Sequence, residues 1–327
     1  STMHIGNIKM VYLDPGAMMG DTEPMKPKLT FLLSLTFLFL FGGSVYGDDY
    51  MRGVNAAKKG DYETAYKLWL PLAEKNNAIA QFNLGTLYDQ GKGVPQSFMR
   101  SYQWYKLSAE QGYSNAQFNL GEMYREGKAV KRDFEKALKW YGLAGKKGLA
   151  EAQCNLGLMY AEGQGVNQNY EEAIKWYRLA AEQGYALAQT NIGLMYEVGE
   201  GVNQNYEEAI KWYHLAAEQG FSGAQSKLGL MYENGKGVMQ NYEKAVKLYR
   251  QSAEQGNLLG QKYLGVMHVL GQGVKKDYNI AYMWFFLSGS KGNKDALKSI
   301  QKIEIEMTSE QIKTAQEMAR NWKPTKK

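Results

Sequence analysis

Residues 167–184 read NQNYEEAIKWYRLAAEQG, and residues 203–220 repeat this stretch with a single change. His214 stands where Arg178 stood, and the two copies are offset by 36 residues. A period of this size is typical of solenoids, in which supersecondary units stack one on the next. The same frame covers nearly the whole chain after residue 48. It therefore predicts an array of repeats and not one globular core.

Glycine recurs in this frame where the second helix of each unit should end. A residue there adopts a left-handed backbone, in which a Cβ costs energy. These glycines are Gly112, Gly148, Gly184, Gly220, Gly256 and Gly292. The loop between the two helices has its own Gly-x-Gly-Val register, with Ala129 in place of the second glycine in the third unit. Each unit therefore reads as a helix, a glycine loop and a second helix.

Both helices of a unit carry the apolar spacing of an amphipathic helix. In the first helix, Gly157 lies in the apolar stripe and is expected to let the partner helix approach closely. In the second helix, Asn169 is placed as N-cap with Glu172 at the third position, which resembles a capping box. The same cap position is filled in other units by Asp61, Asp133, Asn205, Asn241 and Asp277. Tryptophans keep one phase in the second helix, which predicts packing and not a carbohydrate platform; they are Trp104, Trp140, Trp176, Trp212 and Trp284.

The pattern AQxxLGxMYxxGxGVxxxYxxAxxWYxxAAEQG resembles the Sel-one-like repeat (SLR) subfamily of tetratricopeptide-type solenoids. The resemblance covers roughly residues 49–322 and implies an all-α, right-handed α-solenoid (superhelix) of 36-residue helix-turn-helix repeats. Residues 48–76 are expected to form a shorter, tetratricopeptide-like N-terminal cap, and residues 77–292 six Sel-like repeats. Residues 293–327 are expected to supply C-terminal capping helices, which begin at Asn293 and at Thr308, and a tail.

The start of the chain differs from the repeats. Residues 1–24 show no periodic pattern and are interpreted as an upstream extension outside the mature protein. Residues 25–47 contain Lys26 and Lys28, an apolar run over 29–41 and a short tail ending in Gly47, which is the order of a secretory signal peptide. A membrane anchor is the alternative, but a spanning helix needs about 20 apolar residues. We therefore expect cleavage near Gly47 and a periplasmic or secreted mature chain from Asp48.

The sequence holds few residues with catalytic or ligand-binding potential. Cys154 is the only cysteine, and neither His214 nor His268 has a partner at metal-ligand spacing. Serine-hydrolase, zinc-protease and phosphate-loop patterns are also missing from the sequence. The net charge is +6, with no basic stripe of the kind that nucleic acids bind. We expect neither enzymatic activity nor a cofactor, a metal ion or a nucleic-acid partner.

Three functions are compatible with the sequence. The resemblance implies a binding scaffold for protein complexes, which is the function we favour. Some SLR proteins are periplasmic immunity proteins that neutralise lipase-like toxins of contact-dependent secretion systems, and this is the first alternative. Cysteine-rich SLR proteins have been linked with β-lactam binding or hydrolysis. This chain lacks their paired cysteines, which argues against that second alternative.

Analogy with tetratricopeptide units places the first helices on the concave side of the array. Residues one position after the recurring first-helix glycine should point into it, and they change from Thr86 and Glu122 to four apolar residues. With the aromatic residues one turn earlier at the polar end, the predicted partner-binding set is Phe82, Phe118, Leu158, Leu194, Leu230 and Val266. An exposed apolar ladder indicates a covering partner. Packing of these side chains against the second helices stays open as the alternative.

Overall fold

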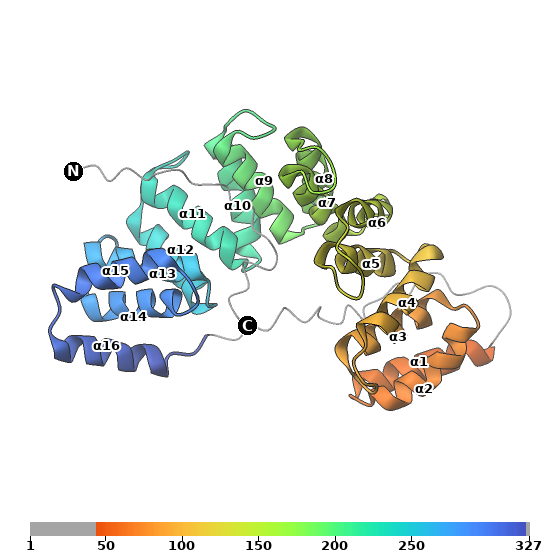
Figure 1. The fold of residues 1–327 in the computed structure, drawn as a ribbon. Coiled ribbons are helices and arrows are strands. Elements are labelled where there is room, and N and C mark those ends of the chain that lie inside the picture. Colours follow the sequence, from red (N-terminus) through yellow and green to blue (C-terminus); the bar gives the residue numbers. More distant parts are fainter. Residues whose placement is uncertain (1–43, 325–327) are drawn as a thin grey trace. The chain divides into compact units, whose positions relative to one another are not determined.

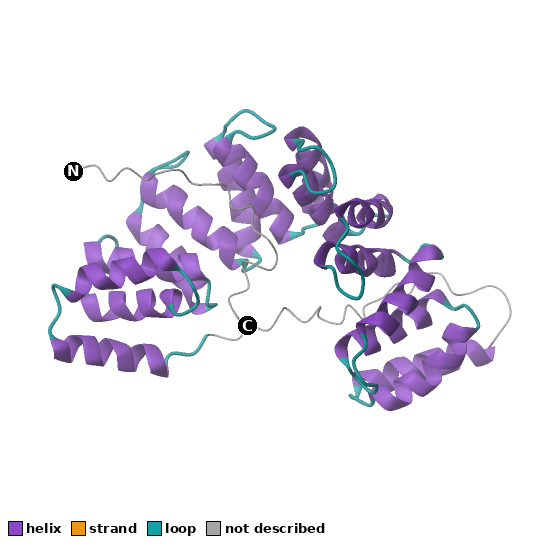
Figure 2. Cartoon of the chain, in the orientation of Figure 1, coloured by secondary structure: helices purple, strands orange, loops and turns teal. Residues whose placement is uncertain are grey.

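The computed structural model describes residues 44–324, which form sixteen α-helices and no strand (Figures 1 and 2). The predicted all-α repeat architecture is confirmed. The predicted extension over 1–24, and the signal peptide up to residue 43, lie outside the described residues. The chain divides at Gln183 and Gly184 into two compact units, called here the N-terminal unit and the C-terminal unit.

The N-terminal unit is a series of helix pairs, each joined by a short loop. Within a pair the two helices pack antiparallel, and the second helix also packs on the first helix of the next pair. Its helices are α1 (Ser44–Lys58), α2 (Tyr62–Glu74), α3 (Ala78–Gln90), α4 (Phe98–Glu110), α5 (Ser114–Glu126), α6 (Phe134–Lys146), α7 (Ala150–Glu162) and α8 (Tyr170–Glu182). The loop between α1 and α2 is shorter than the glycine loops that follow, as the sequence spacing predicted.

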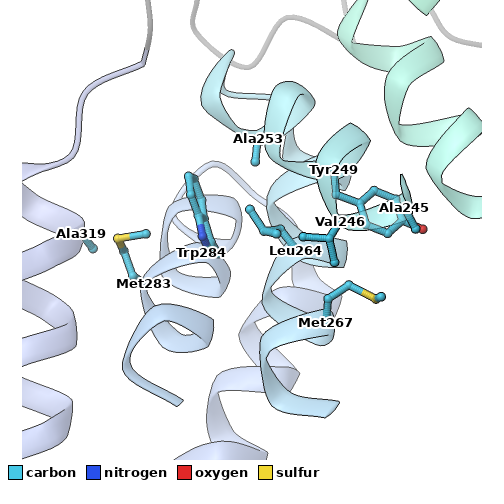
Figure 3. Close-up of a cluster of buried hydrophobic side chains, with 9 residues drawn as sticks. All are labelled: Ala245, Val246, Tyr249, Ala253, Leu264, Met267, Met283, Trp284 and Ala319. Atoms are coloured by element: carbon cyan, nitrogen blue, oxygen red, sulfur yellow. The ribbon is translucent and has the colours of Figure 1, made fainter. Parts of the chain in front are cut away.

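The C-terminal unit continues the helix pairs and ends in a cap. Its helices are α9 (Ala186–Val198), α10 (Tyr206–Glu218), α11 (Ser222–Asn234), α12 (Tyr242–Glu254), α13 (Leu258–Leu270), α14 (Tyr278–Gly289), α15 (Lys294–Glu304) and α16 (Ser309–Asn321). Helix α16 packs on α14, where Trp322 meets Trp284 edge-on at 5.7 Å between ring centroids. Ala319 of α16 joins the buried cluster around Trp284 and Tyr249 (Figure 3). The cap therefore covers the apolar face of the last repeat.

The helix ends follow the chemistry expected from the sequence. Each predicted N-cap side chain accepts a backbone N–H of the first turn, as Asn169 does from Glu172 N at 2.9 Å. The other confirmed caps are Asp61, Asp133, Asn205, Asn241, Asp277 and Asn293. Thr308 and Gln311 form a complete, reciprocal capping box. Such a cap typically contributes about 0.5 to 2 kcal/mol, so the start of the second helix is fixed locally in every repeat.

The loops need a left-handed backbone three times per 36-residue repeat. The six predicted end-of-helix glycines all have φ between 83° and 100°. In the loop before α6, Ala129 takes the position of a glycine and still adopts φ 64°. Because an L-residue pays a steric cost in this region, the surrounding repeat imposes its loop geometry on a sequence that departs from it.

The core of each pair from α1 to α14 is an aromatic ring laid on a glycine, and the ring is a tyrosine except for Trp69 in the first pair and Phe285 in the last. A Cβ built on Gly157 of α7 would lie 2.6 Å from Cδ1 of Tyr177, whose side chain is fully buried. The expected close approach at Gly157 is therefore confirmed. The tryptophans next to these tyrosines are less buried than predicted. Trp140, for example, is half-buried and packs against a cluster formed by Ala109, Ala116 and Leu120.

Gly157→Ala should lower the free energy of unfolding by about 1 to 3 kcal/mol, because the added methyl group overlaps the Tyr177 ring. Gly142→Ala is the matched control, since this helical glycine of α6 has no atom within 4 Å of its Cβ position. There the change should stabilise by up to about 1 kcal/mol through helix propensity alone. Urea unfolding of both variants checks the opposite signs, and equal effects would contradict the packing described here.

Candidate partner-binding surface

The first helices of the C-terminal unit lie side by side. Helix α11 contacts α13, and α13 contacts α15, in addition to the second helix that each of them pairs with. Their shared exposed side is called here the first-helix surface. It is the surface on which the sequence predicted partner-binding residues.

The residues of the predicted apolar ladder differ in how deeply they are buried. Leu158 and Leu194 are only 6% and 5% exposed, so the expectation that they form an open ladder is wrong. Leu230 and Val266 are half-buried and pack at the edges of two core clusters. The aliphatic side chains at this repeat position thus contribute to packing, and in the C-terminal unit Leu230 and Val266 keep part of their surface open.

Phe82 and Phe118 are half-buried and make aromatic contacts within the N-terminal unit. The Phe82 ring lies 5.6 Å from Tyr105 and 5.1 Å from Tyr113, and Phe118 lies 5.7 Å from Tyr141. Contacts of this kind stabilise a fold by about 0.5 to 1.5 kcal/mol per pair beyond area burial. The two phenylalanines therefore have a structural role in addition to any role in binding, which stays a prediction.

Ion pairs that the sequence did not reveal border the open leucine and valine. Lys227 Nζ lies 3.3 Å from Glu197 Oε2, and both side chains are less than one-fifth exposed. The same Glu197 oxygen accepts a hydrogen bond from Tyr213 Oη at 2.6 Å. Lys227 lies three residues before Leu230, on one face of α11, so charge and apolar surface are adjacent there.

A second charged group lies on α13. Lys262 Nζ is 4.5 Å from the centroid of the Tyr263 ring and 3.9 Å from Asp295 of α15. Burial lowers the pKa of Lys262, which Asp295 and Glu233 partly oppose. Lys262 stands where the two preceding repeats have Ser226 and Thr190, and Tyr263 stands where most earlier repeats have asparagine, such as Asn191. The departure of these two positions from the repeat was the sequence signal for this charged group. It did not show which side chains would be in contact.

Glu122 takes the ladder position in α5 and is held by its neighbours. Arg125 Nη2 lies 2.9 Å from one carboxylate oxygen, and Asn155 Nδ2 donates to the other at 2.7 Å. Tyr141 Oη donates to the same oxygen as Asn155. The polar end of the predicted ladder is therefore an internal hydrogen-bond network, which leaves little capacity for a ligand.

The residues considered for catalysis are one cysteine and two histidines. Cys154 is 1% exposed, and burial raises the pKa of its thiol, which disfavours the nucleophilic thiolate. His268 is buried with Nδ1 3.3 Å from the Lys275 carbonyl oxygen, and burial lowers its pKa. His214 is exposed beside Glu218. Among residues 44–324 there is no group of three or more His, Cys, Asp and Glu side chains that could hold a metal ion.

The family model for the Sel1 repeat matches residues 46–77, 78–113, 114–149, 150–185, 186–221, 222–257 and 259–293. This chain is a Sel1 repeat protein. The seven matches include residues 46–77, which correspond to α1 and α2.

Two crystal structures of similar proteins support the assignment. A Sel1 repeat protein from Oxalobacter formigenes is 35% identical with a TM-score of 0.70, over 74% of this chain and 96% of that protein. A protective antigen of uropathogenic Escherichia coli with an SLR fold is 38% identical with a TM-score of 0.68. That match covers 78% of this chain and 55% of the antigen, so the chain spans little more than half of its length. No curated protein matches the sequence.

A buried glutamine in the first helix links successive Sel1 repeats. Gln153 donates from Nε2 to the Gly145 carbonyl oxygen of the preceding repeat at 2.9 Å, and its Oε1 accepts Gln183 Nε2 from the end of its own repeat at 2.7 Å. The arrangement recurs at Gln81 with Gln111, Gln189 with Gln219, and Gln225 with Gln255. The two buried glutamine oxygens without a partner among the described residues, those of Gln117 and Gln261, belong to repeats in which lysine replaces the donor glutamine.

Lys147→Gln should raise the free energy of unfolding by about 1 kcal/mol, because it restores a donor to the buried Gln117 Oε1. Lys147 otherwise donates to the Gly112 carbonyl oxygen. Lys146→Gln removes the same charge at an exposed neighbouring position and is the control. Thermal unfolding compares the two variants. If both shift the midpoint equally, the effect comes from net charge and not from the glutamine pair.

Proposed function

We propose that this Sel1 repeat protein is an exported scaffold that binds a protein partner through its first-helix surface. Sel1 repeats generally mediate protein interactions, and the match extends over seven consecutive repeats. We choose this surface because it combines half-buried Leu230 and Val266 with the Lys227–Glu197 ion pair. Apolar area next to oriented charge is the composition from which specific interfaces are built.

Export is part of the proposal and rests on the order of residues 25–47. The basic start and the apolar run over 29–41 support a signal peptide that is cleaved near Gly47. None of the helices in the described range is long and apolar enough to span a bilayer. A fusion of residues 25–60 to a reporter that is active only outside the cytosol tests this part. An intact N-terminus in the cytosolic fraction would contradict it.

Leu230→Glu should weaken capture of the natural partner at least tenfold, because the new carboxylate replaces apolar contact area. The full chain serves as bait in an envelope extract, and captured proteins are identified by mass spectrometry. Leu215→Glu is the matched control, since this leucine lies on the second helix α10 and is 46% exposed. Loss of capture in both variants, or in neither, would move the site away from the first-helix surface.

The identity of the captured protein separates the remaining alternatives. Selective capture of a lipase-like enzyme, with loss of its activity in the complex, would assign an immunity role. Hydrolysis of a chromogenic β-lactam by the purified chain would instead support an enzyme. We expect no hydrolysis, because the sequence has a single cysteine and so lacks the paired cysteines of the SLR proteins linked with β-lactams.

A further inference from the structure

A second candidate surface lies on the outer side of α4 in the N-terminal unit. Arg100, Trp104 and Leu107 follow one another at helical spacing, and Tyr88 of α3 stands beside them. Together with Gln103 they line an open hollow of about 400 Å³. This surface is separate from the first-helix surface, because most of its residues belong to a second helix.

Leu107 gives this surface open apolar area. Its side chain is 44% exposed, and Trp104 beside it is half-buried. Leu143 and Leu179 occupy the same position in the next two repeats and are 38% and 45% exposed. The leucine therefore recurs, and the hollow at α4 is distinguished by the charged residue next to it.

Arg100 is a cation without a carboxylate partner among residues 47–324. Its Nη1 lies 3.2 Å from Tyr88 Oη, and its guanidinium carbon lies 5.4 Å from the centroid of the Tyr88 ring. The Tyr88 hydroxyl is itself fixed by Tyr66 Oη at 3.1 Å. A guanidinium group has five N–H donors, so most of its capacity to bind an anion is still available.

The cap before α4 explains why Arg100 is unpaired. That cap is Ser97, which is neutral, whereas α6 begins after Asp133. Lys136 occupies the repeat position of Arg100 and is neutralised by Asp133 at 3.0 Å. One repeat later the position is Glu172, which has the opposite charge. At this position residues 46–77 have the uncharged Thr64, so among the repeats of the N-terminal unit only residues 78–113 combine the hollow with an uncompensated cation.

We propose that the hollow on α4 binds a protein segment in which a carboxylate stands next to a large apolar side chain. The apolar side chain packs on Trp104 and Leu107, and the carboxylate accepts hydrogen bonds from Arg100. A planar guanidinium matches both carboxylate oxygens, and the tyrosine ring holds it in place. An anionic membrane is the less suitable ligand. Surface attraction to lipid needs several adjacent cations, and here Lys136 is paired.

The test uses an array of synthetic octapeptides probed with the labelled full chain. Each peptide carries a central Leu or Phe, and the residue next to it is Glu, Gln or Lys. We expect the Glu peptides to be retained about tenfold more strongly than the Gln peptides, as for a hydrogen bond to a charged group. Arg100→Gln and Leu107→Glu should each remove that preference. Lys244→Gln and Leu215→Glu, at the same repeat positions in the C-terminal unit, should leave it unchanged.

Arg100 and Leu107 are exposed, so both variants should keep the helical circular dichroism and melting midpoint of the parent chain. Arg100→Lys is a second variant that keeps the charge but loses the planar fork, and it should bind weakly. Equal retention of Glu and Gln peptides would overturn the proposal, as would undiminished binding by Arg100→Gln. Binding to phosphatidylglycerol vesicles that Arg100→Gln abolishes, without peptide retention, would assign the surface to lipid. None of these outcomes affects partner capture through Leu230, which tests the other surface.

Discussion

Leu194→Glu is expected to destabilise the C-terminal unit by about 3 to 5 kcal/mol. Leu194 is 5% exposed, so the substitution removes a buried aliphatic side chain and introduces a group that must stay ionised in a dry environment or take up a proton. Leu230→Glu affects a half-buried side chain at the same repeat position and should cost much less. The comparison therefore separates packing from binding along the predicted ladder.

Urea unfolding followed by circular dichroism measures this difference. Because the buried carboxyl group is protonated more easily than a free one, the stability of Leu194→Glu should recover partly as the pH falls toward 5. Leu194→Met keeps the volume and polarity and is the matched control, with an expected cost below about 1.5 kcal/mol. If the Leu194→Glu chain were as stable as its parent, Leu194 would lie on the open surface and not in the core.

Alkaline unfolding is the second large effect that the structure predicts. Tyr213 and Tyr249 are fully buried, and their hydroxyl groups donate to Glu197 and Glu233. Burial first, and the adjacent carboxylate second, raise the pKa of both phenols well above the usual value near 10. Burial likewise raises the pKa of Tyr263 to about 12. The folded chain holds these protons after the unfolded chain has released them.

The stability of the fold should decrease as the pH rises above 10. Below pH 10 both states keep the phenol protons, and the stability is complete. Above pH 10 the unfolded state loses protons that the folded state retains, so each buried tyrosine should cost about 1.4 kcal/mol per pH unit. Tyrosinate absorbance should therefore rise together with the loss of helix, in one cooperative step.

A substitution at Tyr249 tests the origin of this step. Tyr249→Phe should move the alkaline midpoint to higher pH, although losing the hydrogen bond to Glu233 costs about 1 kcal/mol at neutral pH. Tyr206→Phe is the control, because its hydroxyl group accepts a bond from the exposed Gln204. Tyrosines that titrate before the helices unfold would show that their hydroxyl groups reach water.

The sequence predicted the local structure well because the signals are local. Asn169 caps its helix with atoms three residues away, and the ring of Tyr177 lies on Gly157 within the same repeat. Even Ala129 keeps the left-handed backbone of the glycine that it replaces. Each of these features depends on one repeat, and the 36-residue period shows the same feature several times.

The candidate site was harder to predict because it depends on contacts between repeats. The period shows which residues occupy equivalent positions, but the depth of each position depends on how neighbouring helices cover it. Leu194 and Leu230 are equivalent in sequence, yet only Leu194 is buried. The Lys227–Glu197 pair joins residues 30 positions apart that the pattern treats as unrelated. Departures from the repeat marked such positions without identifying their partners.

The first-helix glutamines have a consequence for how the array loses structure. In a linear array, the free energy within each repeat and at each junction decides what can open while its neighbour stays folded. Gln117 and Gln261 still donate to the preceding repeat, at the Ala109 and Ala253 carbonyl oxygens. Their amide oxygens lack the bond within the repeat that Gln153 and Gln225 make. The two helices of these repeats are therefore joined by one bond fewer, although the junction to the preceding repeat keeps its bond. In such a repeat the end of the second helix can loosen from the first helix before the array melts as a whole.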